Sequence, residues 1–184
     1  MEEIKLIPPS IEYGEDIMQF RKEMLEMEDM DSFAGCGSLE TCSDIHEWMN
    51  LLVVMENVDT WPKERVTSNT YLAVRISDDK VVGIIDLRHH IDHPILGLWG
   101  GHMGYTVRRD ERNKGYAKEM VRLNLENCRK RHMDKVMITC SRDNIASEKV
   151  ILANCGVFER EVLVDGEWIK RYWVEVGERL DYDW

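Results

Sequence analysis

The sequence of 184 residues predicts a mixed α/β fold, in which a central sheet carries helices on its faces. Three observations support this fold class. Apolar residues recur every three or four positions in several stretches, which is the period of an amphipathic helix. Other stretches alternate apolar with polar residues or are short apolar runs, as expected for strands. The segments follow one another as strand, two helices, three strands, helix, strand, helix and two strands.

The N-terminal third is predicted to contain one strand followed by two helices. Residues 4–7 form a short apolar segment that two prolines end, which suits a strand. Residues 14–29 carry apolar side chains at helical spacing, with acidic residues on the opposite side. A second helix is expected to begin at a polar cap, Ser43 or Asp44, and to run to about residue 57.

The middle of the chain changes from helical to strand periodicity. Residues 71–76 and 81–87 are separated by a polar turn and predict a β-hairpin. Residues 99–107 predict the next strand, in which several glycines indicate a bulge or a close backbone approach. A helix from Ala117 leads to a short apolar strand at residues 135–140. Because a helix joins these last two strands, we expect them to run parallel.

The last quarter of the chain predicts a helix and a hairpin. Asn144 is expected to cap a helix over residues 145–154. Residues 157–164 and 168–176 predict a hairpin, because the Asp-Gly dipeptide between them suits a type I′ turn. With no internal repeat and no low-complexity linker, a single domain over residues 1–184 is expected.

Charge and hydropathy exclude several classes of protein. The chain has 35 acidic and 24 basic residues, a net charge of −11, which argues against a nucleic acid as partner. Its apolar runs are too short to span a bilayer, so no membrane partner is expected. Its first residues lack the pattern of a signal peptide, and we therefore expect a cytoplasmic location.

The five cysteines are expected to be reduced. They are odd in number and include no Cys-x-x-Cys pair, so most of them should fill the core. Cys36, Cys42 and His46 are the nearest approach to a zinc site, but a fourth ligand is missing.

One basic turn has the features of a phosphate site. It lies between the strand at residues 99–107 and the next helix, and it reads Arg112, Asn113, Lys114, Gly115, Tyr116 and Ala117. N–H groups at a helix start lack intrahelical partners, and the helix dipole adds positive charge there. Gly115 lets a ligand approach the backbone. An ordinary helix start is the alternative, because the turn matches neither a Walker loop nor a dinucleotide fingerprint.

The electrostatic field around this turn is expected to be positive, although the protein as a whole is acidic. The basic residues that gather there are Arg108, Arg109, Arg112, Lys114 and Lys118. Such a field would favour a ligand that carries phosphate.

The order of elements around the turn resembles the GNAT superfamily of acyl-CoA-dependent N-acetyltransferases. The likeness rests on Gly104–Arg108, the Arg-x-x-Gly-x-Ala turn Arg112–Ala117, Ile138–Cys140 and Asn144–Ser147. It covers residues 69–176, while the first two helices, about residues 13–57, correspond to the variable acceptor side of the family. The resemblance implies a mixed, mostly antiparallel central sheet with a parallel pair splayed at its centre and helices on both faces.

The resemblance also implies acetyl-CoA as co-substrate, and no metal. The pyrophosphate would lie on the N–H groups of the turn. The pantetheine arm would run beside Tyr105, Thr106 and Val107 as an extra strand would. Asn144 and Ser147 would bind the arm from the helix after the second strand. The alternative is that these two residues are only a helix cap and its first turn.

The catalytic groups are less complete than the donor site. An amine that attacks a thioester must lose a proton, so a general base is useful. The resemblance places His102 on the strand that usually supplies this base, with a structural histidine as the alternative. The tyrosine that serves many family members as general acid falls at Val150 or Ile151 here, and neither donates a proton. Cys155 is expected to be an inert thiol beneath a helix end.

The acceptor is expected to be a small amine or a peptide amine. The segment His89–His93 should form a loop at the rim of the acceptor pocket, with a metal site as the alternative. Asp86, Asp92, Glu23 and Glu26 are candidates for holding a cationic amine. For the two glutamates, a solvated helix face is the alternative.

The sequence is also consistent with two alternative hypotheses of function. The missing tyrosine makes a non-catalytic acyl-CoA-binding or regulatory module an alternative to the enzyme. A purely structural interaction domain is the third alternative, but nothing structural requires so basic a turn at that helix start. The tryptophans near the C-terminus, Trp168, Trp173 and Trp184, permit a homodimer.

Overall fold

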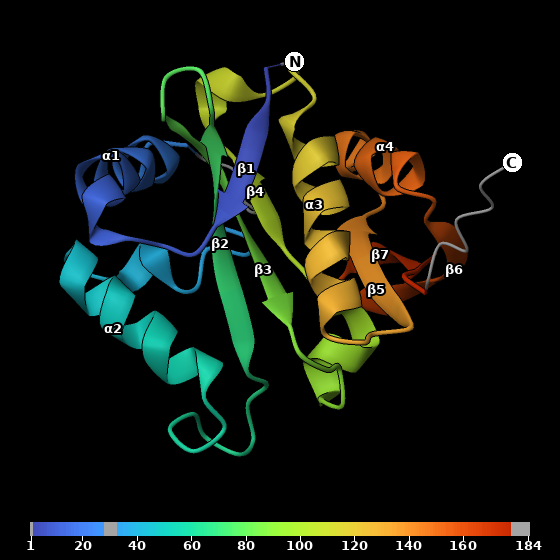
Figure 1. Cartoon of the computed structure of the whole chain (residues 1–184). Helices are drawn as coiled ribbons and strands as arrows, with labels where there is room; N and C mark the ends of the chain where they lie inside the picture. Colours follow the sequence, from blue (N-terminus) through green and yellow to red (C-terminus); the bar gives the residue numbers. More distant parts are fainter. Residues whose placement is uncertain (1, 28–32, 178–184) are drawn as a thin grey trace, which may run out of the picture.

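A computed structural model describes residues 2–27 and 33–177 of the chain, and its strands form two antiparallel sheets (Figure 1). The first sheet has the order β1 (Ile4–Ile7), β2 (Ser68–Arg75), β3 (Val81–Arg88) and β4 (Tyr105–Val107). The second has the order β5 (Lys135–Ser141), β7 (Glu167–Glu175) and β6 (Val157–Val164). The predicted mixed α/β class with mostly antiparallel strands is confirmed.

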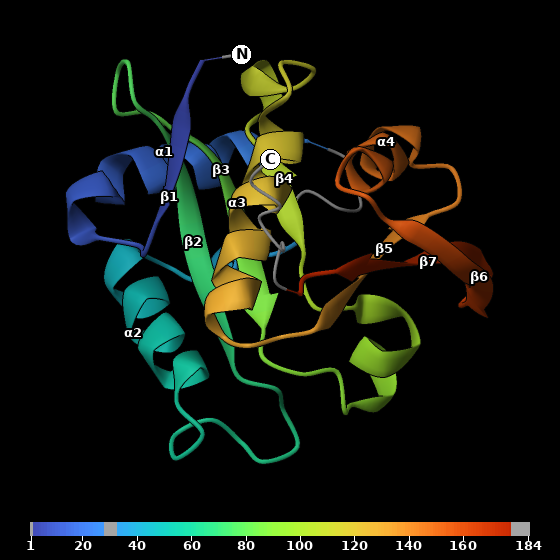
Figure 2. The same cartoon turned by 45° about the vertical axis from the view of Figure 1, so that its right-hand side comes forward.

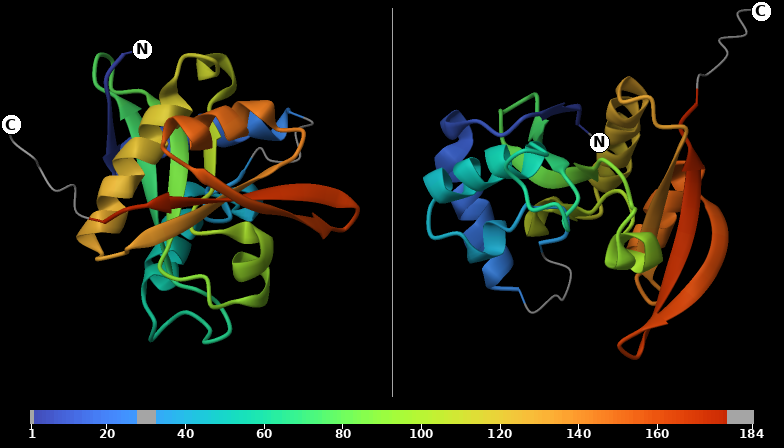
Figure 3. Two further views of the ribbon diagram at one scale, coloured as in Figure 1. Left: turned by 90° about the vertical axis from the view of Figure 1, so that its right-hand side faces the viewer. Right: turned by 90° about the horizontal axis from the view of Figure 1, so that it is seen from below.

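Four α-helices of the described residues pack on these sheets. They are α1 (Gly14–Leu25), α2 (Ile45–Glu56), α3 (Tyr116–Lys130) and α4 (Ile145–Ala153). Helices α1 and α2 cover one face of the first sheet, and α3 lies between the two sheets (Figures 1 and 3). Helix α4 packs on the second sheet beside α3 (Figure 2). None of the helices in residues 2–27 and 33–177 is long and apolar enough to cross a membrane.

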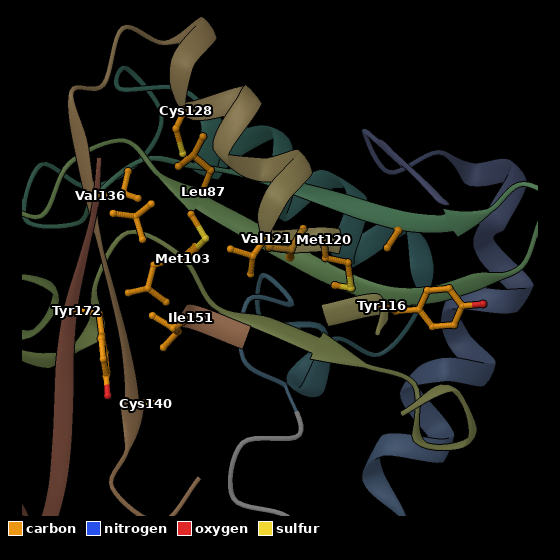
Figure 4. Close-up of a cluster of buried hydrophobic side chains, with 14 of the residues drawn as sticks. Leu87, Met103, Tyr116, Met120, Val121, Cys128, Val136, Cys140, Ile151 and Tyr172 are labelled. Carbon is orange, nitrogen blue, oxygen red and sulfur yellow. The ribbon is translucent and has the colours of Figure 1, made fainter. Parts of the chain in front are cut away.

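The two faces of the first sheet bury separate hydrophobic clusters. One cluster joins α1 and α2 to the sheet and includes fully buried Phe20 and Trp48. The other fills the space among α3, α4 and both sheets, with Met120, Ile151 and Tyr172 among its members (Figure 4). The second cluster therefore holds the two sheets together through α3.

Strands β4 and β5 do not form a hydrogen-bonded pair. Within the described residues they belong to different sheets, and the expected splayed parallel pair at the centre of the sheet is not confirmed. The N–H of His102 donates to the carbonyl of Met137 at 2.8 Å, and the N–H of Met137 donates to the His102 ring at 2.8 Å. Two sheets meet at this contact and diverge from it.

The predicted strand over residues 99–107 is wrong in its first half. The helical turn η3 (Leu96–Gly100) replaces it, and regular pairing of β4 begins only at Tyr105. Arg88 donates to the carbonyls of Gly100 and Gly101, and Arg171 donates to two further carbonyls of the turn. These guanidinium groups satisfy carbonyls that a strand ladder would otherwise have used.

The other predicted elements are confirmed, with shifts at their ends. The hairpin β2–β3 and the closing hairpin β6–β7 form as expected. Asp44 caps α2 and Asn144 caps α4, each through a side-chain oxygen that accepts a backbone N–H. Helix α1 ends at Leu25, short of the predicted residue 29, and residues 28–32 lie outside the described part.

None of the cysteines forms a disulfide within the described residues, and four of them are buried as expected. Cys155 differs: it is exposed, where a thiol beneath the end of α4 was predicted. Its φ of 64° places it in the left-handed conformation that follows many helix ends, which turns the residue outward.

The loop before α2 crosses β4 in close contact. Thr106 donates its hydroxyl to the carbonyl of Ala34 at 2.8 Å, and Trp48 donates its indole N–H to the carbonyls of Cys36 and Gly37. A Cβ at Gly35 would stand 2.0 Å from the carbonyl oxygen of Gly104. Residue 35 must therefore lack a side chain for the loop to lie on β4.

We expect Gly35→Ala to lower the free energy of unfolding by about 2–4 kcal/mol, from a left-handed φ and a backbone overlap together. Gly166→Ala is the matched control, because Gly166 also has a left-handed φ but no atom within 4 Å of its Cβ position. It should cost only about 1 kcal/mol. Denaturant unfolding of both variants measures the difference, and equal losses would contradict the close contact.

Candidate functional site

The turn between β4 and α3 ends in a helix N-terminus, where the first backbone N–H groups lack intrahelical partners. After the short helix η4 (Arg109–Glu111), Asn113 and Gly115 take left-handed φ values of 60° and 89°. Helix α3 begins at Tyr116, and no side chain among the described residues caps its first N–H groups. Left-handed residues before a helix start make a concave set of N–H donors, which is suited to an anion.

A buried carboxylate holds this turn from behind. Glu111 is 3% exposed and accepts hydrogen bonds from Arg75 at 2.8 Å, Lys80 at 3.1 Å and Lys114 at 2.9 Å. Burial alone would raise the pKa of Glu111, but these three cations outweigh it and lower the pKa to about 2. Arg75 also donates to the hydroxyl of Tyr116 at 3.3 Å. The turn is thus fixed to the hairpin β2–β3.

The positive field at the turn is weaker than the sequence suggests. Arg108 is buried, and its side chain pairs with residues of α1. Its guanidinium forms ion pairs with Asp16 and Glu23, each at 2.7 Å. Arg109, Lys114 and Lys118 remain exposed around the turn. The pairing with Arg108 also lowers the pKa of Glu23 and occupies this carboxylate, which was a candidate for holding an amine.

The backbone of β4 offers an unpaired edge. Arg108 N–H donates to the carbonyl of Val82 and Asp86 N–H donates to the carbonyl of Gly104, so even-numbered residues of β4 face β3. The backbone groups of Tyr105 and Val107 therefore point away from β3, toward the side where no strand of the first sheet follows. An extended ligand can hydrogen-bond to such an edge as an added strand.

Arg112 connects this edge to the turn. Its side chain donates to the carbonyl of Val107 at 3.2 Å. Thr106, between Tyr105 and Val107, turns its hydroxyl to the opposite face, where it bonds the loop before α2. The Arg112 side chain therefore joins the end of β4 to the turn, while the Thr106 side chain lies on the other face of the sheet.

His102 is engaged in the contact between the sheets. It is 6% exposed, and its Nδ1 accepts the N–H of Met137. In the neutral ring the other nitrogen, Nε2, then carries the proton and has no lone pair to accept another. Burial lowers the pKa of His102 to about 4, and the charge of Arg88 adds to this effect. This geometry fits the structural alternative for His102, and its role as general base stays a prediction.

Tyr105 and Ser147 meet between β4 and α4. The Tyr105 hydroxyl and the Ser147 hydroxyl lie 2.6 Å apart. Asn144 caps α4 by accepting the N–H of Ser147 at 3.0 Å, which is the ordinary capping role. The structure thus brings together three of the predicted binding residues, Tyr105, Asn144 and Ser147. From the sequence, Tyr105 and Ser147 could be assigned only to separate elements.

The resemblance places the general acid at Val150 or Ile151, and neither side chain can donate a proton. Val150 is half-buried and Ile151 is fully buried in the core. Tyr105 could not be connected with α4 from the sequence, because 42 residues separate it from Ser147. Its alternation within β4 is the one signal that could have placed its side chain on the side of the sheet where α3 and α4 pack.

The histidines of His89–His93 make separate local contacts. His89 bonds Thr67 through Nδ1 at 2.8 Å and Asn69 through Nε2 at 2.7 Å, and burial lowers its pKa to about 4. His90 and His93 accept backbone N–H groups of their own loop. Residues 2–27 and 33–177 contain no group of three His, Cys, Asp or Glu side chains that could hold a metal ion.

Two surface hollows lie away from the predicted cofactor residues. His89 lines one of about 520 Å³ with Asn69, Arg131 and the end of α2. The other, about 480 Å³, is lined by acidic residues at the start of α1 and by Asp79. Asp86, a candidate for holding an amine, already accepts the N–H of Gly104 and the side chain of Arg88.

Comparison with known families assigns most of the chain to one family. A model of the acetyltransferase (GNAT) domain matches residues 4–156. This match includes the first two helices, the turn and the Tyr105–Ser147 contact. A search of curated proteins finds no match to the chain.

Solved structures with related folds are acetyltransferases of several kinds. A putative GnaT-family acetyltransferase from Bordetella pertussis has a TM-score of 0.64 and 13% identity, with 95% of this chain and 97% of that chain covered. RimL, a ribosomal alpha-N-protein acetyltransferase in complex with coenzyme A, has a TM-score of 0.64 and 13% identity, with 94% and 93% covered. A spermidine N-acetyltransferase chimera from Vibrio cholerae SpeG and hSSAT has a TM-score of 0.63 and 11% identity, with 94% and 95% covered. At such identities the likeness shows the fold alone.

Glu111→Gln should destabilise the protein by about 3 kcal/mol at neutral pH, because it removes the charge that three cations surround. The pKa of Glu111 is lowered from 4.5 to about 2 on folding, so its contribution is complete above pH ~4.5 and is lost as pH falls through about 2. Denaturant unfolding at several pH values should therefore show a smaller acid loss for Glu111→Gln than for the wild type.

The control is Glu126→Gln, which removes an exposed partner of Arg122 and should cost less than about 1 kcal/mol. The same acid dependence in wild type and Glu111→Gln would show that this network does not fix the turn.

Proposed function

Because the chain belongs to the GNAT acetyltransferase family, we propose that it transfers an acetyl group from acetyl-CoA to a primary amine in a ternary complex. The observation that carries this proposal is the uncapped start of α3 after the turn Arg112–Ala117, next to the outer edge of β4, which pairs with no other strand among the described residues. The single domain over residues 1–184 and a cytoplasmic location belong to the same proposal.

The donor fits this surface in one direction. Its pyrophosphate binds the N–H groups at the start of α3, with Arg112, Asn113, Lys114, Gly115, Tyr116 and Ala117 around it. Its pantetheine arm follows the edge of β4 past Val107 and then Tyr105, where backbone groups point outward. Asn144 and Ser147 bind the arm from α4. The side chain of Tyr116 is turned inward to Arg75, so only its backbone takes part.

The protein holds the amine and the thioester in position for the reaction and polarises the thioester carbonyl. The amine nitrogen attacks the thioester carbonyl, a C–N bond forms, and the C–S bond then breaks. We assign the outward N–H group of Tyr105 to the carbonyl oxygen as it gains charge, and the outward N–H group of Val107 to the arm. The amine proton leaves to water, since the structure gives His102 no free lone pair.

The acceptor class follows from charge and from relatives. The net charge of −11 suits a cationic amine. RimL is a ribosomal-protein acetyltransferase and the chimera is a spermidine acetyltransferase, so a peptide amine and a small amine both have precedents in the fold. A homodimer is compatible with the exposed Trp168 of the second sheet, and Trp184 lies outside the described residues.

Two observations favour a second candidate function. Val150 and Ile151 replace the usual acid, and His102 is bonded at Nδ1, so a non-catalytic acyl-CoA-binding module of the same fold is the alternative. Thiol release from acetyl-CoA with a panel of amines separates the two. Release with any amine establishes the enzyme, whereas binding without release on every amine supports the module.

Gly115→Glu should weaken coenzyme A binding at least about 100-fold, because it places a negative charge against the pyrophosphate. Gly166→Glu is the matched control, since Gly166 has a similar φ of 85° in the β6–β7 turn. Calorimetric titration measures both affinities, and circular dichroism verifies that each variant is folded. Unchanged affinity of a folded Gly115→Glu would contradict the assignment of the turn.

His102→Asn should keep the acetylation rate within about threefold, because the Asn oxygen can accept the N–H of Met137 as Nδ1 does. His102→Leu should instead destabilise the fold by about 1–3 kcal/mol, since it leaves that N–H unsatisfied. A loss of about 100-fold or more in His102→Asn with normal stability would restore His102 as the general base.

A further inference from the structure

The contact between Tyr105 and Ser147 is a pair of hydroxyls with no structural necessity for either. Tyr105 is half-buried and packs against the cluster that joins the sheets, and a phenylalanine would fill the same space. Ser147 stands in the first turn of α4, where the N–H that Asn144 accepts is the group needed for capping. The two hydroxyls nevertheless lie 2.6 Å apart, from elements that are 42 residues apart in sequence.

The direction of the edge of β4 places this pair at the reactive end of the donor. The phosphate turn follows β4 in the chain, so a ligand held at Arg112–Ala117 passes Val107 before it reaches Tyr105. The end of the arm farthest from the phosphates carries the sulfur. Tyr105 and Ser147 are therefore the hydroxyls that the sulfur meets, on the side of β4 opposite to Thr106.

We propose that the Tyr105 hydroxyl, supported by Ser147, donates a hydrogen bond to the donor sulfur and stabilises the thiolate as the C–S bond breaks. This inference rests on the proposed function, because it requires coenzyme A to lie along β4. Tyr105 would take the role of hydrogen-bond donor to the leaving thiolate, which Val150 and Ile151 cannot perform. Ser147 donates to the Tyr105 oxygen in this arrangement, and Tyr105 donates to sulfur.

The chemistry favours a hydrogen bond over a full proton transfer. A thioester sulfur is a weak acceptor and a thiolate is a strong one, so the bond strengthens as the bond to carbon breaks. Burial raises the pKa of Tyr105, and the Cys140 thiol adds to this, against the opposing effect of Ser147. The phenol thus keeps its proton. The amine gives one proton to water, and the thiolate takes one from water after it leaves.

The contact between Tyr105 and Ser147 satisfies both hydroxyls within the fold. A buried hydroxyl without a partner costs about 1–3 kcal/mol, and the mutual bond removes this cost. When the arm is bound, Ser147 keeps its bond to the Tyr105 oxygen while the phenol proton turns to sulfur. Donation into the phenol oxygen makes its O–H a stronger donor.

The test measures the pKa of the coenzyme A thiol in the complex. Calorimetry first establishes that coenzyme A binds to wild type, Tyr105→Phe and Tyr71→Phe. The thiolate absorbance is then titrated with pH, and the complex with an analogue that carries a methylene in place of sulfur supplies the blank for the protein cysteines. Tyr71→Phe is the matched control, because Tyr71 lies on β2 and also packs against the joining cluster.

In wild type and Tyr71→Phe the bound thiol should titrate at least about one pH unit lower than in Tyr105→Phe. The rate constant for acetyl transfer should fall roughly 10- to 100-fold in Tyr105→Phe, with little change in coenzyme A affinity. Ser147→Ala should shift both quantities in the same direction by a smaller amount, and it tests the pair if Tyr105→Phe does not fold.

An equal thiol pKa in wild type and Tyr105→Phe, with coenzyme A bound to both, would overturn the role of Tyr105 and leave the proposed function intact. Absence of coenzyme A binding to the wild type would overturn the proposed function together with this inference. A lower rate in Tyr105→Phe without a shift in thiol pKa would assign the tyrosine to packing only.

Discussion

The hydrogen bonds between His102 and Met137 determine the form of the whole site. They join the segment that precedes β4 to β5. Beyond this contact, β4 and β5 belong to different sheets. A strand pair that continued past this point would use the outward backbone groups of Tyr105 and Val107 and leave none for a ligand. Because His102 is buried and its Nδ1 is occupied, the residue most suggestive of catalysis in the sequence is the one that holds this geometry.

A second constraint is the rigidity of the phosphate turn, which ion pairs and hydrogen bonds behind it provide. Glu111 binds three cations from behind the turn, and Arg75 reaches both Glu111 and the Tyr116 hydroxyl. A surface whose N–H groups are already fixed loses little conformational freedom when it binds an anion. Much of the basic charge near the turn is thus used to shape it, and the backbone remains the principal donor to the ligand.

Patterns within short stretches of the sequence predicted the features that depend on interactions between neighbouring residues. The helical periods, the Asp44 and Asn144 caps and the Asp-Gly hairpin are confirmed, since each depends on neighbours in the chain. Side-chain contacts across long separations were not predictable: Arg108 meets Asp16 across 92 residues and Tyr105 meets Ser147 across 42. The helical turn η3 was missed because Arg171, from β7, supplies the donors that fix it.

The central claim is that one surface, from the turn Arg112–Ala117 along the edge of β4, holds the acetyl donor. A crystal structure of the protein with coenzyme A tests it most directly. The account predicts the pyrophosphate on the N–H groups at the start of α3, the arm hydrogen-bonded to Tyr105 and Val107, and the sulfur beside the Tyr105 hydroxyl. Coenzyme A bound at any other face, with this edge unoccupied, would contradict it.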